Sequence, residues 1–347
     1  MTSSSILFII PYHWLDSVLW LRYTVAQLKK HGDVVLVTDY GVGKIRTFDP
    51  EVPQIEPVGM GVGRARNAGI MYGLQHGYDC LIFSDSHMLI QDYAEKQVRY
   101  LQVDQSVIPD NVEKLCNYKL AQPAITAVDT KSGQLVEGNA VLGDFLDEWT
   151  WQWHYILKTT TRKSITSTQP MFSMQRDTAE AIVSANGGIY TQCLYWGKEN
   201  FDPTISAARL GIDMDLVPEV KVGHVYKMGS PKGWKKRFNL DTTFWLKDID
   251  RYEPWYGKYQ PESPYLFGIQ FGDAVYALKH YGTLAGDPSD DVIYRLPVDR
   301  TALSIASQVD WIMKSVREFN KNAKYTRHQV YERLATYLVG AFEVPVR

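Results

Sequence analysis

Residues 61–89 read GVGRARNAGIMYGLQHGYDCLIFSDSHML, and their apolar residues change from helical spacing to a continuous run. Apolar side chains recur at helical spacing from Ala68 to Leu74, and Gly77 is placed to end the helix that they predict. The apolar run CLIFS that follows predicts a short buried strand, which ends just before Asp85. The stretch therefore predicts a helix that leads directly into a buried strand with a polar carboxyl end.

The residues before this stretch continue the same alternation of strands and helices. Apolar runs predict buried strands at residues 5–10 and 33–39, and helical spacing predicts a helix at residues 15–30 between them. Elements that alternate in this way indicate a parallel sheet with crossover helices. Ligands bind such sheets at the carboxyl ends of the strands, where Asp39 and Asp85 stand.

Length and composition favour one large catalytic domain with an appended C-terminal part. The chain has 347 residues, of which 45% are hydrophobic and 22% are charged, as in ordinary globular proteins. We expect the catalytic domain at residues 1–250 and an aromatic-rich, helical extension at residues 251–347. The net charge of −2 gives no overall attraction to nucleic acid or membrane. No apolar run reaches the roughly 18 residues of a membrane-spanning helix, so we expect no span.

The three cysteines, Cys80, Cys116 and Cys193, form no CxxC motif and no even set. We expect all three to be reduced and buried, because this pattern suits a reducing compartment. The cysteine pattern and the lack of a secretion signal at the N-terminus predict a cytoplasmic protein.

The rest of the chain predicts a further set of elements. Apolar runs and helix caps predict a strand at 120–128, a helix at 142–157, a helix capped by Asp177 and closed by Asn186, a short helix with Asp202 as its N-cap, an extended segment at 213–227, a basic loop at 227–238, and helices at 301–320 and 326–339.

Three short motifs carry candidate chemistry, and they occur in the order FSDSHM, WGKEN and VGHVYK. In the first, Asp85 and His87 stand two positions apart, so both side chains project to the same side of an extended segment. Such a pair can present one oxygen and one nitrogen to a metal ion. For these two residues alone, the plain alternative is a turn in which Asp85 caps the backbone and His87 forms its hydrogen bonds within the protein.

Together the three motifs resemble the catalytic domain of the polypeptide N-acetylgalactosaminyltransferases and, more broadly, the GT-A glycosyltransferases, including the family-2-like enzymes. That family has an Asp-x-His at the end of a central strand, then WGGEN, then VGHVFR, in this order and at this spacing. The resemblance covers roughly residues 6–240. It implies an α/β fold of the GT-A type, a Rossmann-like nucleotide-diphospho-sugar transferase fold with a mostly parallel central sheet, here followed by a C-terminal helical extension.

The resemblance also implies a metal-dependent hexosyltransferase that uses a nucleotide sugar, UDP-linked, and transfers the sugar to a hydroxyl with retention. The leaving diphosphate needs a cation to offset its developing charge. Asp85, His87 and His224 would be the protein ligands, and this mixed oxygen and nitrogen set suits Mn²⁺ better than Mg²⁺.

Further roles follow from the resemblance residue by residue. On the nucleotide side it implies Asp39, Arg64, Arg66, Asn67, Asp85, Ser86 and Lys227, and on the sugar and acceptor side it implies Glu199, Trp196 and Asn200. The plain alternatives are a turn residue for Asp39, a cap of the following helix for Glu199, and a solvated position for one of the two arginines.

Several positions depart from the family pattern. Lys198 replaces a glycine and would bring a positive side chain into the acceptor-side loop, Lys227 replaces an arginine, and residues 88–90 replace the family's cysteines. The acceptor stays open among protein hydroxyls, glycans, small molecules and a hydroxylated base in DNA, the last suggested by the basic loop at 227–238. The alternative function is a non-catalytic protein that binds nucleotide sugars or glycans with the same fold.

Overall fold

The structure of the chain is a computed structural model. It describes residues 5–12, 18–38, 48–57, 61–86, 88–90, 111–127, 143–146, 153–156, 162–164, 170–194, 198–224, 264–282, 293 and 295–338.

The first half of the described chain forms the parallel part of one sheet. The elements, in chain order, are β1 (Ile6–Tyr12), α1 (Val18–Leu28), β2 (Asp33–Thr38), β3 (Gln54–Ile55), α2 (Val62–Gln75) and β4 (Cys80–Ser84). The strands lie side by side in the order β3-β2-β1-β4 and all run parallel, as the alternation of strands and helices predicts.

The two crossover helices cover opposite faces of this parallel part. Alternate residues of β1 point to opposite faces: Phe8 packs in one hydrophobic core with Leu21 of α1, and Ile9 packs in another with Ile70 of α2. Both faces of the strands are therefore buried, which is why the strands read as continuous apolar runs.

The second half extends the same sheet and makes it mixed. The remaining strands of this sheet are β5 (Met88–Ile90), β6 (Leu120–Ala127), β9 (Lys163–Ser164), β10 (Met171–Gln175) and β11 (Met214–His224), and the 3₁₀ helix η1 (Val112–Asn117) precedes β6. In the nine-stranded sheet β10 lies between β4 and β6 and runs antiparallel to both. β11 runs parallel to β6 and antiparallel to the short β5.

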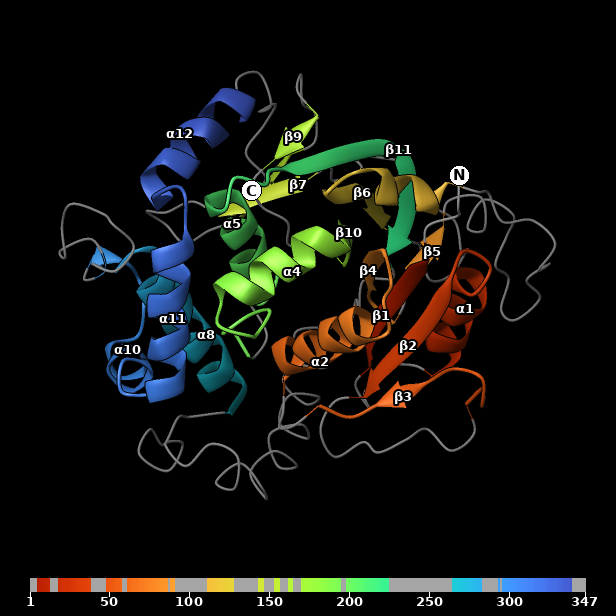
Figure 1. The fold of residues 1–347 in the computed structure, drawn as a ribbon, viewed down its shortest axis with the longest axis horizontal. Helices are drawn as coiled ribbons and strands as arrows, with labels where there is room; N and C mark the ends of the chain where they lie inside the picture. The colour runs from red at the N-terminus through yellow and green to blue at the C-terminus, as the bar shows by residue number, and fades with distance from the viewer. Residues whose placement is uncertain are drawn as a thin grey trace.

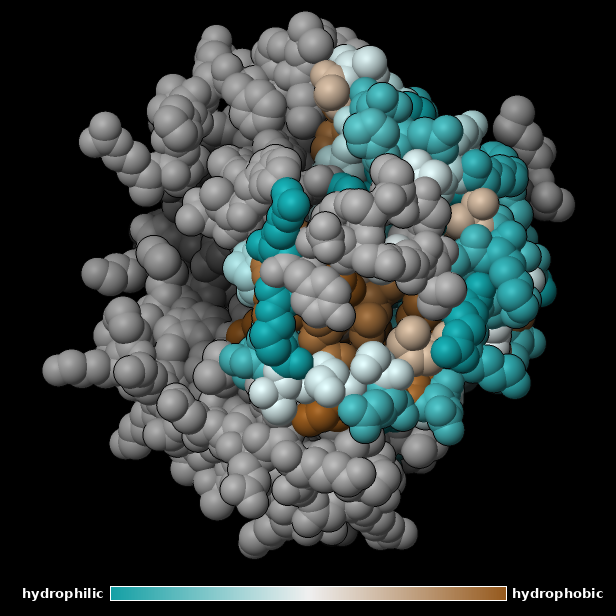
Figure 2. All heavy atoms as spheres, turned by 90° about the vertical axis from the view of Figure 1, so that its left-hand side faces the viewer, coloured by the Kyte–Doolittle hydropathy of each residue, from teal (hydrophilic) through white to brown (hydrophobic). Residues whose placement is uncertain are grey.

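Six further helices complete the described part. They are α4 (Arg176–Ala185), α5 (Phe201–Arg209), α8 (Pro264–His280), α10 (Arg300–Ala306), α11 (Asp310–Asn322) and α12 (Arg327–Leu338). The four C-terminal helices lie together on the side of the molecule away from β1 and β2 (Figure 1). They share a hydrophobic core with α5, in which Phe201 and Ile205 pack with Phe271, Ile312 and Val330. On their outer face, hydrophilic residues cover most of the coloured surface, and hydrophobic ones are visible in a hollow between them (Figure 2).

Two of the predicted elements are wrong. Residues 142–157 contain two antiparallel strands, β7 (Gly143–Leu146) and β8 (Trp153–Ile156), in place of the predicted helix. Their aromatic residues favour strands once a pairing partner is available. The single helix predicted at 301–320 is divided into α10 and α11, with Val309 in an extended conformation between them.

The predicted helix caps have mixed outcomes. Asp177 and Asp202 lie inside the first turns of α4 and α5, so their assignment as capping residues is wrong. Asn186 is confirmed as the residue that closes α4. Thr326 caps α12: its hydroxyl accepts from the Gln329 N–H at 3.3 Å, and the Gln329 side chain accepts from the Thr326 N–H at 2.9 Å. The predicted domain boundary at residue 250 lies outside the described residues.

The prediction of three reduced cysteines is wrong for two of them. Cys80 of β4 and Cys116 of η1 form a disulfide, and Cys193 is a free, buried thiol. The pairing joins a strand to a 3₁₀ helix that packs beside it, and no sequence spacing reveals this proximity. The cysteines therefore no longer argue for a reducing compartment. No helix among the described residues is long and apolar enough to span a bilayer.

Candidate active site at the strand ends

The Asp-Ser-His motif lies where β4 ends and β5 begins. The Asp85 N–H donates to the Pro170 carbonyl at 2.9 Å, and the carbonyl of the buried Ser86 accepts from the Thr24 hydroxyl of α1 at 3.1 Å. These two bonds fix the main chain of the motif between β10 and α1. The motif then leads into β5, whose first residue, Met88, lies opposite His224 in the register with β11.

This register brings two of the predicted metal ligands together. His224 Nε2 lies 3.3 Å from Asp85 Oδ2, and the side chains are 10% and 34% exposed. One carboxylate and one imidazole thus meet at the strand ends, where the Asp85 side chain is partly open to solvent and the ring nitrogens of His224 are buried. Within the described residues no group of three His, Cys, Asp or Glu side chains could hold a metal ion, and His87 is not among those residues. The metal-binding role of Asp85, His87 and His224 stays a prediction.

Arg66 of α2 is a buried cation beside the same strands. Its side chain is held over aromatic rings of β4 and β10, with Cζ 5.4 Å from the Phe83 ring centroid and 5.7 Å from that of Phe172. Its Nε and Nη1 atoms have no hydrogen-bond partner among the residues described. Buried polar atoms of this kind need a partner, and an anionic ligand would provide one. The role predicted for Arg66 on the nucleotide side stays a prediction.

The other described residues of the segment predicted to bind the nucleotide form hydrogen bonds with the backbone of residues 190–194. The Asn67 side chain donates to the Thr191 carbonyl at 2.9 Å, and accepts from the N–H groups of Tyr190 at 3.1 Å and Thr191 at 2.8 Å. The nearby N–H groups of Gly63 and Arg64 donate to the Leu194 carbonyl at 2.9 and 3.3 Å. Asn67 therefore positions residues 190–194, and the nucleotide contacts predicted for Asn67 and Arg64 stay predictions.

Gly63 is required by the closeness of this contact. A Cβ atom at Gly63 would lie 2.0 Å from the Cys193 carbonyl oxygen, a distance that no relaxed structure tolerates. The N-terminus of α2 consequently rests directly against the chain that leads into the WGKEN motif.

The described part of the WGKEN motif is buried and joins the C-terminal helices. Glu199 is 2% exposed, and Asn200 occupies the N-cap position of α5, so Glu199 is not the helix cap. Lys198 is 4% exposed, and its Nζ lies 2.9 Å from Asp273 Oδ1 of α8. The expectation that Lys198 puts a positive side chain into the acceptor-side loop is therefore wrong, because its charge is neutralised inside the protein.

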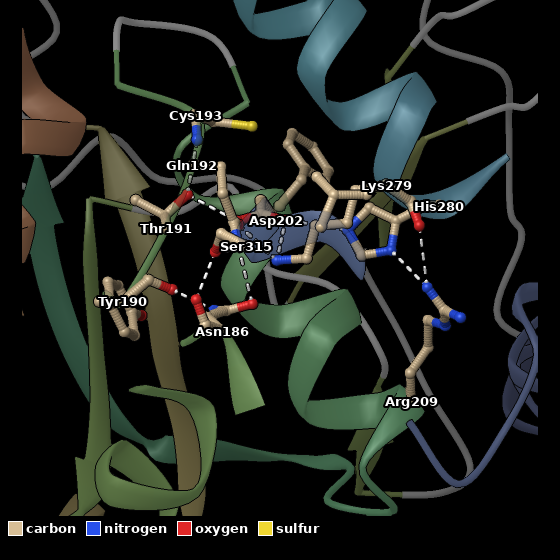
Figure 3. Close-up of polar contacts among 12 residues, drawn as sticks. Asn186, Tyr190, Thr191, Gln192, Cys193, Asp202, Arg209, Lys279, His280 and Ser315 are labelled. Atoms are coloured by element: carbon tan, nitrogen blue, oxygen red, sulfur yellow. Dashed lines mark hydrogen bonds and ion pairs between the residues drawn. The ribbon is translucent and has the colours of Figure 1, made fainter. Parts of the chain in front are cut away.

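A buried polar network, which the sequence did not indicate, lies next to this motif (Figure 3). The carboxylate of Asp202 is 2.7 Å from Lys279 Nζ and 2.9 Å from His280 Nε2, and it accepts from the Thr191 hydroxyl at 2.6 Å. Lys279 also donates to Gln192 at 2.7 Å. The sequence shows only that Lys279 and His280 are adjacent. Their shared partner, Asp202, lies far away in the chain, in α5.

Burial governs the protonation states in this network. Burial opposes ionisation of Asp202, but Lys279 and His280 outweigh it and hold the pKa of the carboxyl well below its ordinary value. Burial lowers the pKa of His280 to about 3, against the opposing effect of Asp202. His280 Nδ1 faces Arg209 Nη1 at 3.4 Å, so it accepts a hydrogen bond from the guanidinium while Nε2–H donates to Asp202. The neutral imidazole satisfies both contacts.

Four predicted features lie outside the described residues. They are Asp39, His87, Trp196, and the basic loop at 227–238 with Lys227.

Comparison with known proteins identifies the fold. No family model and no curated protein matches the sequence. The structure of GalNAc-T7 with UDP, GalNAc and Mn²⁺ matches with a TM-score of 0.56 and 18% identity over 100% of this chain. The mannosyltransferase PcManGT of Pyrobaculum calidifontis with GDP-Man and Mn²⁺ gives a TM-score of 0.37 and 11% identity, over 97% of this chain and 86% of that one. The latter score is too low to support an argument.

This chain spans 59% of the length of the GalNAc-T7 chain. The similarity extends through the whole of this chain, so it includes both the mixed sheet and the C-terminal helices. The chain has the GT-A fold of the nucleotide-sugar transferases.

Proposed function

We propose that the chain is a divalent-metal-dependent glycosyltransferase that transfers a hexosyl group from a UDP-linked sugar to a hydroxyl acceptor, with retention. The observation that carries the proposal is the meeting of Asp85 and His224 at the strand ends of a GT-A fold, with 3.3 Å between Oδ2 and Nε2. GalNAc-T7, which shares this fold, was solved with UDP, GalNAc and Mn²⁺.

The donor set fits a divalent ion. Asp85 offers carboxylate oxygens at a partly exposed position, His224 offers a buried imidazole nitrogen beside them, and His87 would be the third ligand. Bound there, the ion would offset the negative charge that develops on the diphosphate leaving group.

The chain's own residues would orient the donor around this point. Arg66, whose guanidinium is buried against Phe83 and Phe172, would contribute positive charge on the phosphate side. Lys227 would add a second positive charge on the phosphate side. Glu199 would contact the sugar or the acceptor, as its place in the WGKEN motif implies, and Asn67 and Gly63 hold the chain that leads to it against α2.

The test of this function is a thermal-shift and donor-hydrolysis experiment with UDP and UDP-sugars, with and without Mn²⁺. An enzyme should be stabilised by UDP only when Mn²⁺ is present, and it should release UDP from the correct donor. His87→Ala should abolish the Mn²⁺-dependent shift while the protein stays folded. A shift that persists in this variant contradicts the ligand assignment, and binding without UDP release identifies a non-catalytic protein.

Glu199→Gln tests the sugar and acceptor side. We expect transfer to fall by about 10²- to 10³-fold, because an electrostatic contact to the transition state is lost. The Mn²⁺-dependent affinity for UDP should be kept. If UDP binding is lost instead, Glu199 belongs to the nucleotide side.

The acceptor class can be decided by the salt dependence of its binding. A polyanionic acceptor such as hydroxylated DNA should lose affinity linearly with the logarithm of the salt concentration, and Lys235→Ala with Lys236→Ala should flatten that slope. A glycan, peptide or small neutral acceptor should show little salt dependence, and the DNA acceptor is then excluded.

A further inference from the structure

Two buried ion pairs join helix α8 to the WGKEN motif and to the start of α5. In one pair α8 provides the anion, and in the other it provides the cation. Lys198 of the motif meets Asp273 of α8 at 2.9 Å, and Asp202 of α5 meets Lys279 of α8 at 2.7 Å. The Asp273 side chain is 14% exposed and the other three are 4% exposed or less. Because one pair has its cation on the motif and the other has it on α8, the two pairs together define how α8 lies along residues 198–202.

Such pairs act mainly on geometry. Desolvation of two buried charges offsets much of the attraction between them, so the pair as a whole adds little net stability. Removal of one partner, however, leaves a buried charge uncompensated and forces the surroundings to rearrange. The Lys198–Asp273 pair therefore makes the position of the motif sensitive to a residue of the C-terminal helices.

Glu199 stands between the anchored positions. The Lys198 carbonyl accepts from the Asp202 N–H at 2.9 Å, which closes residues 198–202 into a turn. The Lys198 side chain extends from this turn to α8, and its Nζ also lies 5.8 Å from the Phe201 ring centroid. The backbone on both sides of Glu199 is thus held. In the glycosyltransferase pattern a glycine replaces Lys198, so this anchor belongs to the present chain.

We propose that Asp273 is a positioning residue that, through Lys198, holds Glu199 in the geometry needed for sugar transfer. The inference rests on the proposed function, and it assigns a role in that function to helix α8. The turn carries the carboxylate, and the helix determines where the turn lies.

The main test is Asp273→Asn, with kcat and KM for the donor measured separately. We expect kcat to fall by about 10- to 100-fold, since small misplacements of a reacting group have effects of this size. KM for the donor should change by less than about twofold, because donor binding uses the strand-end residues. Asp273→Glu keeps the charge and should restore most of kcat. Lys198→Met, which removes the buried cation itself, should give the same loss of kcat if Asp273→Asn fails to fold.

The matched control is a second ion pair between the C-terminal helices and the rest of the chain. Arg333 of α12 lies 3.0 Å from Asp213, which lies between α5 and β11 and outside the turn of residues 198–202. Asp213→Asn should leave kcat unchanged. An equal loss of kcat in Asp213→Asn and Asp273→Asn would overturn the inference, because it would show a general loss of stability.

Hydrogen exchange separates failure of this inference from failure of the proposed function. In Asp273→Asn the amides of residues 199–202 should exchange faster, whereas those of β4 should not. If the wild-type protein is active and Asp273→Asn keeps its kcat, the inference is overturned while the function stands. If the wild-type protein transfers no sugar, the proposed function is wrong. If, in addition, the amides of residues 199–202 exchange equally fast in the wild-type protein and in Asp273→Asn, the anchoring role of Asp273 is overturned as well.

Discussion

Two Asp–His pairs in this molecule have the same chemistry and different surroundings. Asp85 and His224 lie 3.3 Å apart at the strand ends, with side chains 34% and 10% exposed. Asp202 and His280 lie 2.9 Å apart between α5 and α8, and both side chains are completely buried. The carboxylate of the first pair is open to a ligand, whereas both members of the second pair are enclosed by the protein.

The enclosed pair is part of the packing between helices. Lys279 balances the charge of Asp202, and Arg209 donates to the Lys279 carbonyl at 3.1 Å and to Asn320 at 2.8 Å. The bonds of this network are made within the protein, so it links α5, α8 and α11 without access for substrate. An Asp–His contact of the second kind is therefore structural, whereas the first leaves a carboxylate, that of Asp85, within reach of a ligand.

The largest expected effect is on the enclosed pair. Asp202→Asn keeps the shape of the side chain but leaves Lys279 as a buried, uncompensated cation. We expect the free energy of unfolding, measured by urea denaturation, to fall by about 3–5 kcal/mol. Asp85→Asn is the matched control and should change it by less than about 0.5 kcal/mol in the absence of ligand. Similar losses in the two variants would contradict the distinction between the pairs.

The next effect concerns the Asp85–His224 pair in the presence of ligand. At a concentration of UDP and Mn²⁺ 100 times the dissociation constant, the wild-type protein should gain about 2.7 kcal/mol of stability. Asp85→Asn should lose this gain, measured as the ligand-induced rise in Tm. Asp79, which accepts from the Ser5 N–H at 2.9 Å at the opposite end of β4, provides a control carboxylate. Asp79→Asn should keep the ligand-induced rise, and a loss in both variants would argue against a specific site.

The smallest effect is a pH dependence of stability from the enclosed histidine. Burial lowers the pKa of His280 from 6.5 to about 3, so between these values the unfolded chain binds a proton that the folded chain excludes. This contribution to stability is complete above about pH 6.5 and is lost as the pH falls, by at most about 1.4 kcal/mol per pH unit. Urea denaturation from pH 6.5 to 4.5 should show a shallower slope in His280→Gln. Equal slopes would show that His280 is protonated in the folded protein.

Local sequence patterns correctly predicted the elements that have a clear pattern of apolar residues. Strand β4 and helix α2 were predicted because buried strands are continuous apolar runs and because the helix has a three-to-four-residue period. The helix predicted at residues 142–157 was wrong because aromatic side chains fit a helix or a strand, and the pairing of β7 with β8 decided between them. The Lys198 side chain could not be placed from sequence, because its partner Asp273 lies in a helix that the sequence did not predict.

By itself, the sequence determined the alternating strands and helices and singled out Asp85 and His224 as candidates. These properties depend on neighbours within a few residues, or on short motifs whose order along the chain can be read directly. Only the tertiary structure decided that Asp85 faces His224, that Cys80 bonds to Cys116, and that Asp202 is enclosed by α8. Each of these contacts joins segments far apart in the chain, and their proximity depends on strand order, register and helix packing.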